Sequence, residues 1–274
     1  MKYGLIAGNG RFPILALEEA RKLGHQAIAF GIREEASKEI EALASKTHWI
    51  SIGQLGRLID LLKEEGVTEL IMTGQVKHVQ IFSGIQPDWR LAKLLFRLAA
   101  KNTDSLIGGV VEELEKEGIH LRDSTFLLKP LLAAEGVMSR RKPSREEETD
   151  IAYGRRVANA LSAFDVGQSV AIAERACLAV EAMEGTDEML RRAAGLANGR
   201  PIRLVKASRR RQHMLFDVPV AGPRTIEVMR ETGATALAVD AGRTLLIDRE
   251  EMLAAANAAG IAIAGYKPEE ESKS

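Results

Sequence analysis

Residues 3–13 read YGLIAGNGRFP, and this stretch decides the fold. Its first part, Tyr3–Ala7, is a short apolar run typical of a buried strand, and a helical pattern begins at Pro13. A glycine turn, GNG at residues 8–10, joins the two. A strand, a glycine turn and a helix in this order are typical of an α/β fold, and they place backbone N–H groups where an anion can bind.

The glycine turn is a candidate phosphate- or nucleotide-binding site. It reads G-x-G-x-x-P, whereas dinucleotide-binding proteins have G-x-G-x-x-G. The next predicted strand ends in FGIR at residues 30–33, with no acidic residue at its tip to hold a ribose hydroxyl, so NAD is disfavoured. The alternative is a tight turn that needs glycine only for its backbone angles.

Short apolar runs and helical patterns alternate outward from this stretch through the first half of the chain. Because such alternation is typical of β-α units, we expect a parallel sheet. The predicted strands are Gln26–Phe30, Glu69–Met72 and Ile119–Leu121, and the predicted helices cover Pro13–Leu23, Glu34–Ala44, 55–62, 91–98 and Ser105–Glu117.

A charged run, SRRKPSREEETD at residues 139–150, marks the predicted domain boundary because it holds proline and no apolar residue. A chain of 274 residues also suits two domains better than one core. We therefore expect a Rossmann-like parallel sheet over residues 1–138, a linker at 139–150, a mixed α/β domain over 151–266 and a disordered polar tail at 267–274.

Composition excludes several classes of protein. Basic and acidic residues both total 38 and aromatic residues make up only 4%, so neither a nucleic-acid surface nor a base-stacking platform is expected. The lone Cys177 fits a reducing cytosol and excludes a thiolate metal site. No apolar stretch is long enough to span a bilayer, so any membrane contact would be peripheral. The basic helix Arg90–Lys101 is the candidate for it, and a core-facing helix with a solvated rim is the alternative.

Two loops carry candidate binding residues. Gly74 and Lys77 follow a predicted strand of the parallel sheet, at the edge where such sheets bind ligands. In the second half, Glu181, Glu184 and Asp187 gather around Thr186. Three carboxylates repel one another unless a metal, sugar hydroxyls or nearby arginines compensate them, or Thr186 or Asp187 caps the following helix.

The segment KASRRRQHMLFDVPVAGPRT at residues 206–225 places one aspartate, Asp217, between apolar neighbours after a basic loop. Such a carboxylate can hold Mg²⁺ or orient a water, and Lys206 can neutralise phosphate oxygens. A solvated surface turn is the alternative for this segment.

Several segments together give the chain its resemblance to a known family. They are GLIAGNGRFP at 4–13, DVGQ at 165–168, AVEAMEGTDEMLRR at 179–192, and the spaced Lys206, Gln212, Phe216, Asp217, Pro219, Gly222 and Thr225. With these segments the chain resembles the UDP-2,3-diacylglucosamine pyrophosphatases of the type unrelated to calcineurin-like metallophosphoesterases. It departs from that pattern at His213 and Leu215, where the family usually has an aspartate and an arginine.

The resemblance implies a cytoplasmic Mg²⁺-dependent hydrolase of lipid A biosynthesis that releases lipid X and UMP, with water attacking the β-phosphorus. It implies that Asp217 is the catalytic residue and the candidate metal ligand, with UMP held by the N-terminal domain. The candidate substrate-binding residues are Gly8, Asn9, Gly10, Phe12, Gly74, Lys77, Gln168, Glu184, Thr186, Asp187, Lys206, Gln212 and Thr225. A non-catalytic nucleotide-sugar or lipid carrier on the same fold is the alternative, and peripheral contact with the inner membrane and a homodimer stay open.

Overall fold

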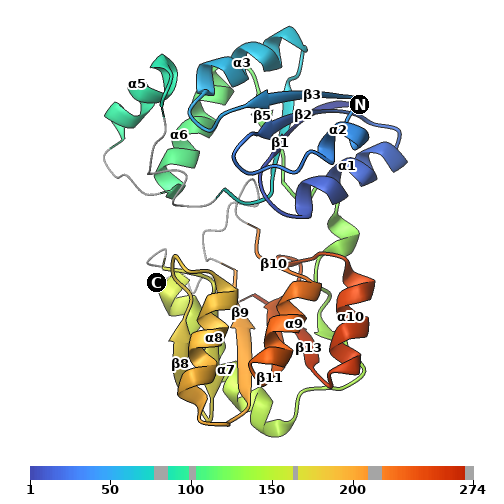
Figure 1. The fold of residues 1–274 in the computed structure, drawn as a ribbon, viewed down its shortest axis with the longest axis vertical. Coiled ribbons are helices and arrows are strands. Elements are labelled where there is room, and N and C mark those ends of the chain that lie inside the picture. Colours follow the sequence, from blue (N-terminus) through green and yellow to red (C-terminus); the bar gives the residue numbers. More distant parts are fainter. Residues whose placement is uncertain (77–85, 99–102, 163–165, 209–217, 269–274) are drawn as a thin grey trace. The chain divides into compact units, whose positions relative to one another are not determined.

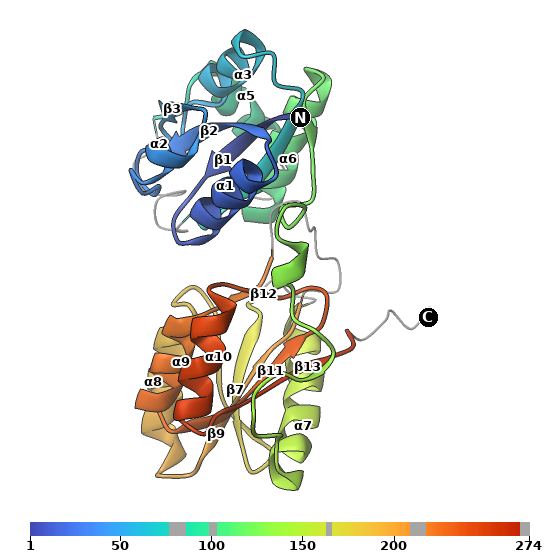
Figure 2. The same ribbon diagram turned by 90° about the vertical axis from the view of Figure 1, so that its right-hand side faces the viewer.

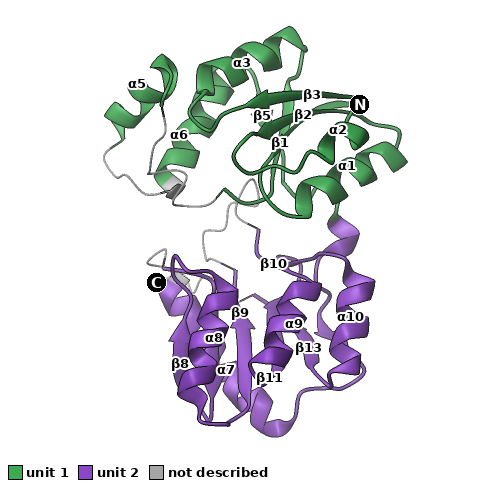
Figure 3. Cartoon of the chain, viewed as in Figure 1, with its two compact units in different colours: residues 1–128 green, residues 129–274 purple. Residues whose placement is uncertain are grey.

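The computed structural model describes the chain except for residues 77–85, 99–102, 163–165, 209–217 and 269–274. The chain divides into two compact units, Met1–Leu128 and Lys129–Ser274 (Figure 3). No helix in the described part combines the length and the apolar character needed to cross a membrane.

The first unit is built on a five-stranded sheet in the order β3-β2-β1-β4-β5, and every neighbouring pair is parallel (Figure 1). The same strand order, 3-2-1-4-5, occurs in doubly wound sheets of the Rossmann type. The predicted parallel sheet is confirmed. The strands are β1 Lys2–Ala7, β2 Gln26–Ile32, β3 Lys46–Ile50, β4 Glu69–Thr73 and β5 His120–Leu121.

The helices of this unit follow the predicted pattern with one difference. The helix expected at Glu34–Ala44 is reduced to the short α2, and the strand β3 that follows was not predicted. Because β3 lies at the sheet edge and is only partly buried, it has no continuous apolar run to reveal it. The helices are α1 Phe12–Lys22, α2 Ile40–Leu43, α3 Leu55–Glu64, α5 Trp89–Arg97 and α6 Thr103–Lys116.

The second unit contains a mixed six-stranded sheet in the order β6-β13-β11-β9-β7-β8. The three central strands β13, β11 and β9 are parallel, whereas β6, β7 and β8 run antiparallel to their neighbours. The predicted mixed α/β architecture is confirmed. The strands are β6 Gly136–Val137, β7 Ser169–Ala173, β8 Ala176–Val180, β9 Ile202–Lys206, β11 Ala234–Asp240 and β13 Ala262–Tyr266, and a separate parallel pair is formed by β10 Val220–Ala221 and β12 Leu245–Leu246.

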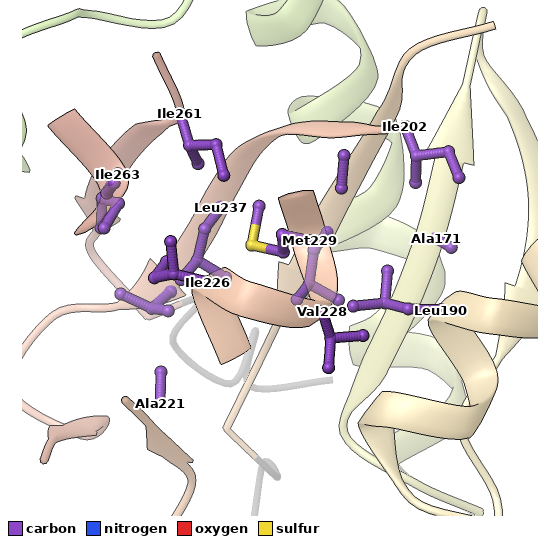
Figure 4. Close-up of a cluster of buried hydrophobic side chains, with 14 of the residues drawn as sticks. Ala171, Leu190, Ile202, Ala221, Ile226, Val228, Met229, Leu237, Ile261 and Ile263 are labelled. Atoms are coloured by element: carbon purple, nitrogen blue, oxygen red, sulfur yellow. The ribbon is translucent and has the colours of Figure 1, made fainter. Parts of the chain in front are cut away.

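Helices cover both faces of this sheet (Figure 2). The helix α7, Arg145–Ser162, packs on one face through residues such as Ile151, which join Ala236 and Ala238 of β11. Leu237, which lies between those alanines and points to the opposite face, joins the larger core beneath the other three helices. These are α8 Thr186–Ala197, α9 Pro223–Glu231 and α10 Arg249–Ala258. Figure 4 shows Met229 of α9 in this core with Leu237.

The observed division between the units differs from the predicted linker at 139–150. This charged run belongs to the second unit, where three of its charged residues form ion pairs. The Arg141 guanidinium donates to both carboxylate oxygens of Glu147 (2.6 and 2.9 Å), and Thr235 Oγ1 donates to the same carboxylate (2.6 Å). Asp150 lies 3.3 Å from Arg203 Nε. A run that looks like a solvated linker in the sequence therefore fixes the start of α7 against β11 and β9.

Candidate functional site

The glycine turn after β1 packs directly against the loop after β4. The Gly8 N–H donates to the carbonyl of Thr73 (2.8 Å), and Asn9 and Gln75 exchange two backbone hydrogen bonds (2.7 and 3.0 Å). A Cβ on Gly8 would lie 2.7 Å from the Gln75 carbonyl oxygen, and one on Gly74 would lie 2.6 Å from the Asn9 carbonyl oxygen. Glycine is needed at both positions because the two loop backbones touch.

This contact brings Gly8, Asn9 and Gly74 together at the carboxyl edge of the parallel sheet, as expected for a binding loop. The sequence suggested that backbone N–H groups of this turn bind an anion. Those of Gly8 and Asn9 are instead bonded to the neighbouring loop. Gly10 adopts a positive φ of 96°, and Phe12 is buried as the first residue of α1.

An acidic side chain does lie beside the glycine turn. The Asn9 side-chain amide donates to Glu35 Oε2 (3.2 Å), although the strand β2 ends three residues earlier, at Ile32. The expectation of no acid at this position was based on the strand tip alone. Glu35 is reached through the turn that follows β2, which the sequence pattern did not reveal.

A second cluster lies at one end of the mixed sheet in the other unit. Lys206 is the last residue of β9 and pairs in register with Ser169, the first residue of the antiparallel β7. Glu181 follows β8, and its N–H donates to the Ser169 carbonyl (2.9 Å). Thr186 begins α8 directly beyond. Strand direction therefore gathers four polar side chains from four elements at one place.

The Thr186 hydroxyl is the centre of this cluster. It donates to Glu181 Oε1 (2.7 Å) and accepts from Lys206 Nζ (3.0 Å), and Ser169 Oγ lies 3.3 Å away. Burial opposes the charge on Glu181, but the positive charge of Lys206 and hydrogen bonds from neighbours including Thr186 outweigh it and lower the pKa of this carboxyl. Glu181 is thus ionised, and the Thr186 hydroxyl that it orients holds the Lys206 ammonium in place.

The other two carboxylates of this loop are compensated by arginines. Glu184 Oε1 accepts from the Arg192 guanidinium (2.5 Å), as the arginine alternative predicted. Asp187 Oδ2 lies 3.4 Å from Arg224 Nε of α9, a partner that the sequence did not indicate. Neither Thr186 nor Asp187 caps α8, because the N-cap residue is Gly185 and makes no side-chain capping bond.

Thr225 and Gln168 have local backbone contacts in the same unit. The Gly222 N–H donates to Thr225 Oγ1 (3.3 Å) at the start of α9, and the Ala207 N–H donates to the Gln168 carbonyl (2.9 Å) beside Lys206. The contact between Arg224 and Asp187 joins the first turns of α9 and α8. Four residues of the candidate set are therefore near one another: Gln168, Thr186, Asp187 and Lys206. Thr225, in contrast, accepts a hydrogen bond from Gly222, the N-cap residue of its own helix.

Lys77, Gln212 and Asp217 lie outside the described residues, as do His213 and Leu215. Among the residues that are described, no group of three histidine, cysteine, aspartate or glutamate side chains could hold a metal ion. Glu184 and Asp187 pair with arginines and Glu181 Oε1 accepts from Thr186, so these carboxylates do not by themselves form a magnesium site.

The family of the chain follows from matches to both of its halves. A family model described as the LpxI N-terminal domain matches residues 2–131, and one described as the LpxI C-terminal domain matches residues 134–264. The chain belongs to the LpxI family. A member from Caulobacter vibrioides, named UDP-2,3-diacylglucosamine pyrophosphatase LpxI, is 32% identical to it, and the match covers 98% of this chain and 99% of that protein. The resemblance drawn from the sequence segments is confirmed.

Solved structures add little to this LpxI assignment. A UDP-glucose-4-epimerase from Stenotrophomonas maltophila with bound NAD is 15% identical, with a TM-score of 0.29 over 44% of this chain and 35% of that one. A biotin carboxylase domain from Hydrogenobacter thermophilus is 13% identical, with a TM-score of 0.27 over 72% of this chain and 41% of that one. These values are too low to bear on fold or function.

Proposed function

We propose that this chain hydrolyses the pyrophosphate of UDP-2,3-diacylglucosamine to 2,3-diacylglucosamine 1-phosphate, or lipid X, and UMP, in lipid A biosynthesis. One observation carries the proposal: both LpxI domains match along the chain, and the relative that bears this activity in its name aligns with nearly all of it. The cluster around Lys206 supports it, because a fixed cation suits the negative charge of a pyrophosphate.

In this proposal the second unit binds the sugar phosphate, and Lys206 neutralises charge that develops on a phosphoryl oxygen. Thr186 and the ionised Glu181 hold the ammonium in place, so little reorganisation is needed during the reaction. The first turns of α8 and α9, joined by Asp187 and Arg224, lie at the same part of the unit and add helix N-termini that favour an anion.

The first unit binds the UMP part of the substrate at the glycine turn. The glycine contacts between Gly8 and Gly74 fix the loop, and Glu35 and Asn9 offer a carboxylate and an amide to sugar hydroxyls. This assignment is independent of the second unit's chemistry and can be tested by UMP binding alone.

Asp217 is proposed as the catalytic residue that orients the attacking water, and Mg²⁺ as the cofactor, with Asp217 as its candidate ligand. When bound, Mg²⁺ would stabilise negative charge on the pyrophosphate. We further propose a cytoplasmic location, peripheral contact with the inner membrane and a homodimer.

The proposed function is tested by incubating the pure protein with UDP-2,3-diacylglucosamine and Mg²⁺ and following UMP by chromatography. Multiple turnovers that release UMP and the acylated sugar 1-phosphate in equal amounts are expected. Stoichiometric binding of the substrate without release of UMP would favour the carrier alternative and contradict the proposal.

A further inference from the structure

The helix α5 carries two of the most exposed aromatic side chains of the described residues. Trp89 is 81% exposed and Phe96 is 93% exposed, and Lys93 between them is also exposed. These three residues are spaced i, i+4 and i+7, so they lie on one helical face, here called the α5 outer face. Exposed aromatic side chains that share one face are typical of an interaction surface.

The opposite face of α5 fixes the helix to its unit. Leu91 and Leu94 are buried, and Leu94 packs so closely against α6 that a Cβ on Gly109 would lie 2.7 Å from its Cδ1. The Arg97 side chain pairs with Glu113 of α6, and the Arg90 side chain pairs with Glu117, the residue after this helix.

The start of α5 is fixed as well. The Asp88 carboxylate caps it by accepting from the Leu91 N–H (3.0 Å), and its other oxygen accepts from the Gly56 N–H of α3 (2.6 Å). One side chain therefore ties the first turns of two helices together. Because both the start and the inner side of α5 are held, Trp89, Lys93 and Phe96 point away from the unit in a fixed orientation.

We infer that the α5 outer face docks onto the surface of an anionic lipid bilayer. Two aromatic side chains on one side of a helix suit the boundary between headgroups and acyl chains, and a lysine between them suits anionic headgroups. The helix contains three basic and no acidic residues. Its two arginines pair with glutamates, so the charge on the outer face itself is that of Lys93. The inference rests on the proposed function in one respect, because an acylated substrate gives the chain a reason to meet a bilayer.

A second copy of the chain fits this face less well. Two aromatic side chains expose about 150–250 Å² each, well below the roughly 800 Å² per partner of a stable interface. A two-fold contact through the α5 outer face would also bring Lys93 of each copy near the other without an acidic partner on the same helix. An anionic surface satisfies both the aromatic and the cationic side chains.

The test uses the fluorescence of Trp89. The chain has two tryptophans, so Trp49→Phe in the full-length protein leaves Trp89 as the only one. Vesicles of phosphatidylglycerol and phosphatidylcholine should shift its emission to the blue and allow quenching by brominated acyl chains, whereas vesicles of phosphatidylcholine alone should do so weakly. No shift with anionic vesicles would overturn the inference. A shift that grows with protein concentration in the absence of lipid would overturn it in favour of a second copy.

Variants test whether the α5 outer face is the part of the chain that binds the vesicles. Phe96→Ser and Lys93→Glu should each weaken binding to the anionic vesicles by about tenfold, since each removes a contact with the bilayer. Lys22→Glu and Leu23→Ser are matched controls, because both residues are exposed on the same unit at the end of α1. Equal losses in the controls would contradict the assignment.

A second measurement separates this inference from the proposed function. With substrate dispersed in detergent, the Phe96→Ser and Lys93→Glu variants should release UMP at the wild-type rate. With substrate embedded in anionic vesicles, the same variants should be slower by about the factor lost in binding. Wild-type rates in both assays would overturn a docking role, and absence of turnover by the wild-type protein would count against the proposed function alone.

Discussion

The Lys206 ammonium donates to the Thr186 hydroxyl over 3.0 Å, and this bond joins the end of β9 to the start of α8. A threonine hydroxyl has one proton, which here is donated to Glu181, so its oxygen is free to accept from Lys206. The ionised Glu181 therefore orients the hydroxyl that in turn orients the ammonium. An ammonium held in a fixed position in this way is suited to bind an anionic group on the substrate.

Thr186→Val should lower kcat by roughly tenfold, because the loss of one charge-assisted hydrogen bond leaves Lys206 less well placed. Thr186→Ser keeps the hydroxyl and should stay within about twofold of the wild type. Initial rates of UMP release measure both. If valine and serine at this position give equal rates, the hydroxyl does not position Lys206.

Asp217→Ala should abolish hydrolysis and leave the substrate bound, because a carboxylate that aligns a water or metal stabilises the transition state more than the ground state. Single-turnover kinetics and equilibrium binding of the substrate separate the two effects. Asp60→Ala, an exposed change on α3, is the control. A variant at Asp217 that retains more than about a tenth of the wild-type kcat, a loss below roughly 1.4 kcal/mol, would remove this residue from the reaction.

Turnover should stop in excess EDTA and return when Mg²⁺ is added in excess of the chelator. One cysteine and five histidines in the whole chain favour oxygen ligands, which suit a hard cation such as Mg²⁺. The measurement is UMP release before and after the addition of metal, with Ca²⁺ as a comparison. Undiminished turnover in EDTA would show that the reaction does not need a divalent cation.

The buried Glu147 should make the free energy of unfolding of the second unit depend on pH in the acid range. Burial opposes its charge, but hydrogen bonds from Arg141, Thr235 and Ser144 outweigh it and lower its pKa from 4.5 to about 2. The resulting contribution is fully present above about pH 4.5 and is lost as the pH falls to about 2, and it amounts to about 3 kcal/mol.

Urea unfolding followed by circular dichroism between about pH 2 and 6 measures this dependence. Glu147→Gln should be less stable than the wild type at neutral pH and should lose less stability on acidification. Glu146→Gln, at the exposed neighbouring position, should follow the wild-type curve. Parallel curves for all three proteins would contradict the role of Glu147.

Much of the fold could be predicted because the strands of a parallel sheet are buried on both faces and appear as apolar runs. Tyr3–Ala7 and Glu69–Met72 were recognised in this way, whereas β3 at the sheet edge was not. The linker at 139–150 was misjudged because a charged residue gives no sign in the sequence of whether its partner is water or, as for Glu147, an arginine.

The candidate site was predictable in its residue types but not in its pairings. Lys206 was a candidate because of its charge and Thr186 because of the resemblance, but the bond between them depends on β7 running antiparallel to β9, which is decided by tertiary contacts. Asp187 meets Arg224 for the same reason, because α8 and α9 begin near the same part of the unit. Spacing along the chain cannot supply such partners.

The last prediction concerns which phosphorus is attacked. Water could add to the α-phosphorus beside uridine or to the β-phosphorus beside the sugar, and both routes give the same two products. In the proposed division of roles, the first unit binds UMP as the leaving group, and Lys206 and Asp217 in the second unit act on the phosphorus nearer the sugar. This division favours attack at the β-phosphorus.

Hydrolysis in ¹⁸O-labelled water distinguishes the two routes, because the oxygen of the attacking water stays on the phosphorus that it attacks. Mass spectrometry should find the label in the sugar 1-phosphate and only natural abundance in UMP. Single-turnover conditions keep later exchange from obscuring the result, and unlabelled water is the control. Label in UMP would mean that water is activated on the nucleotide side. The roles assigned to the two units would then be exchanged, even with the same substrate and products.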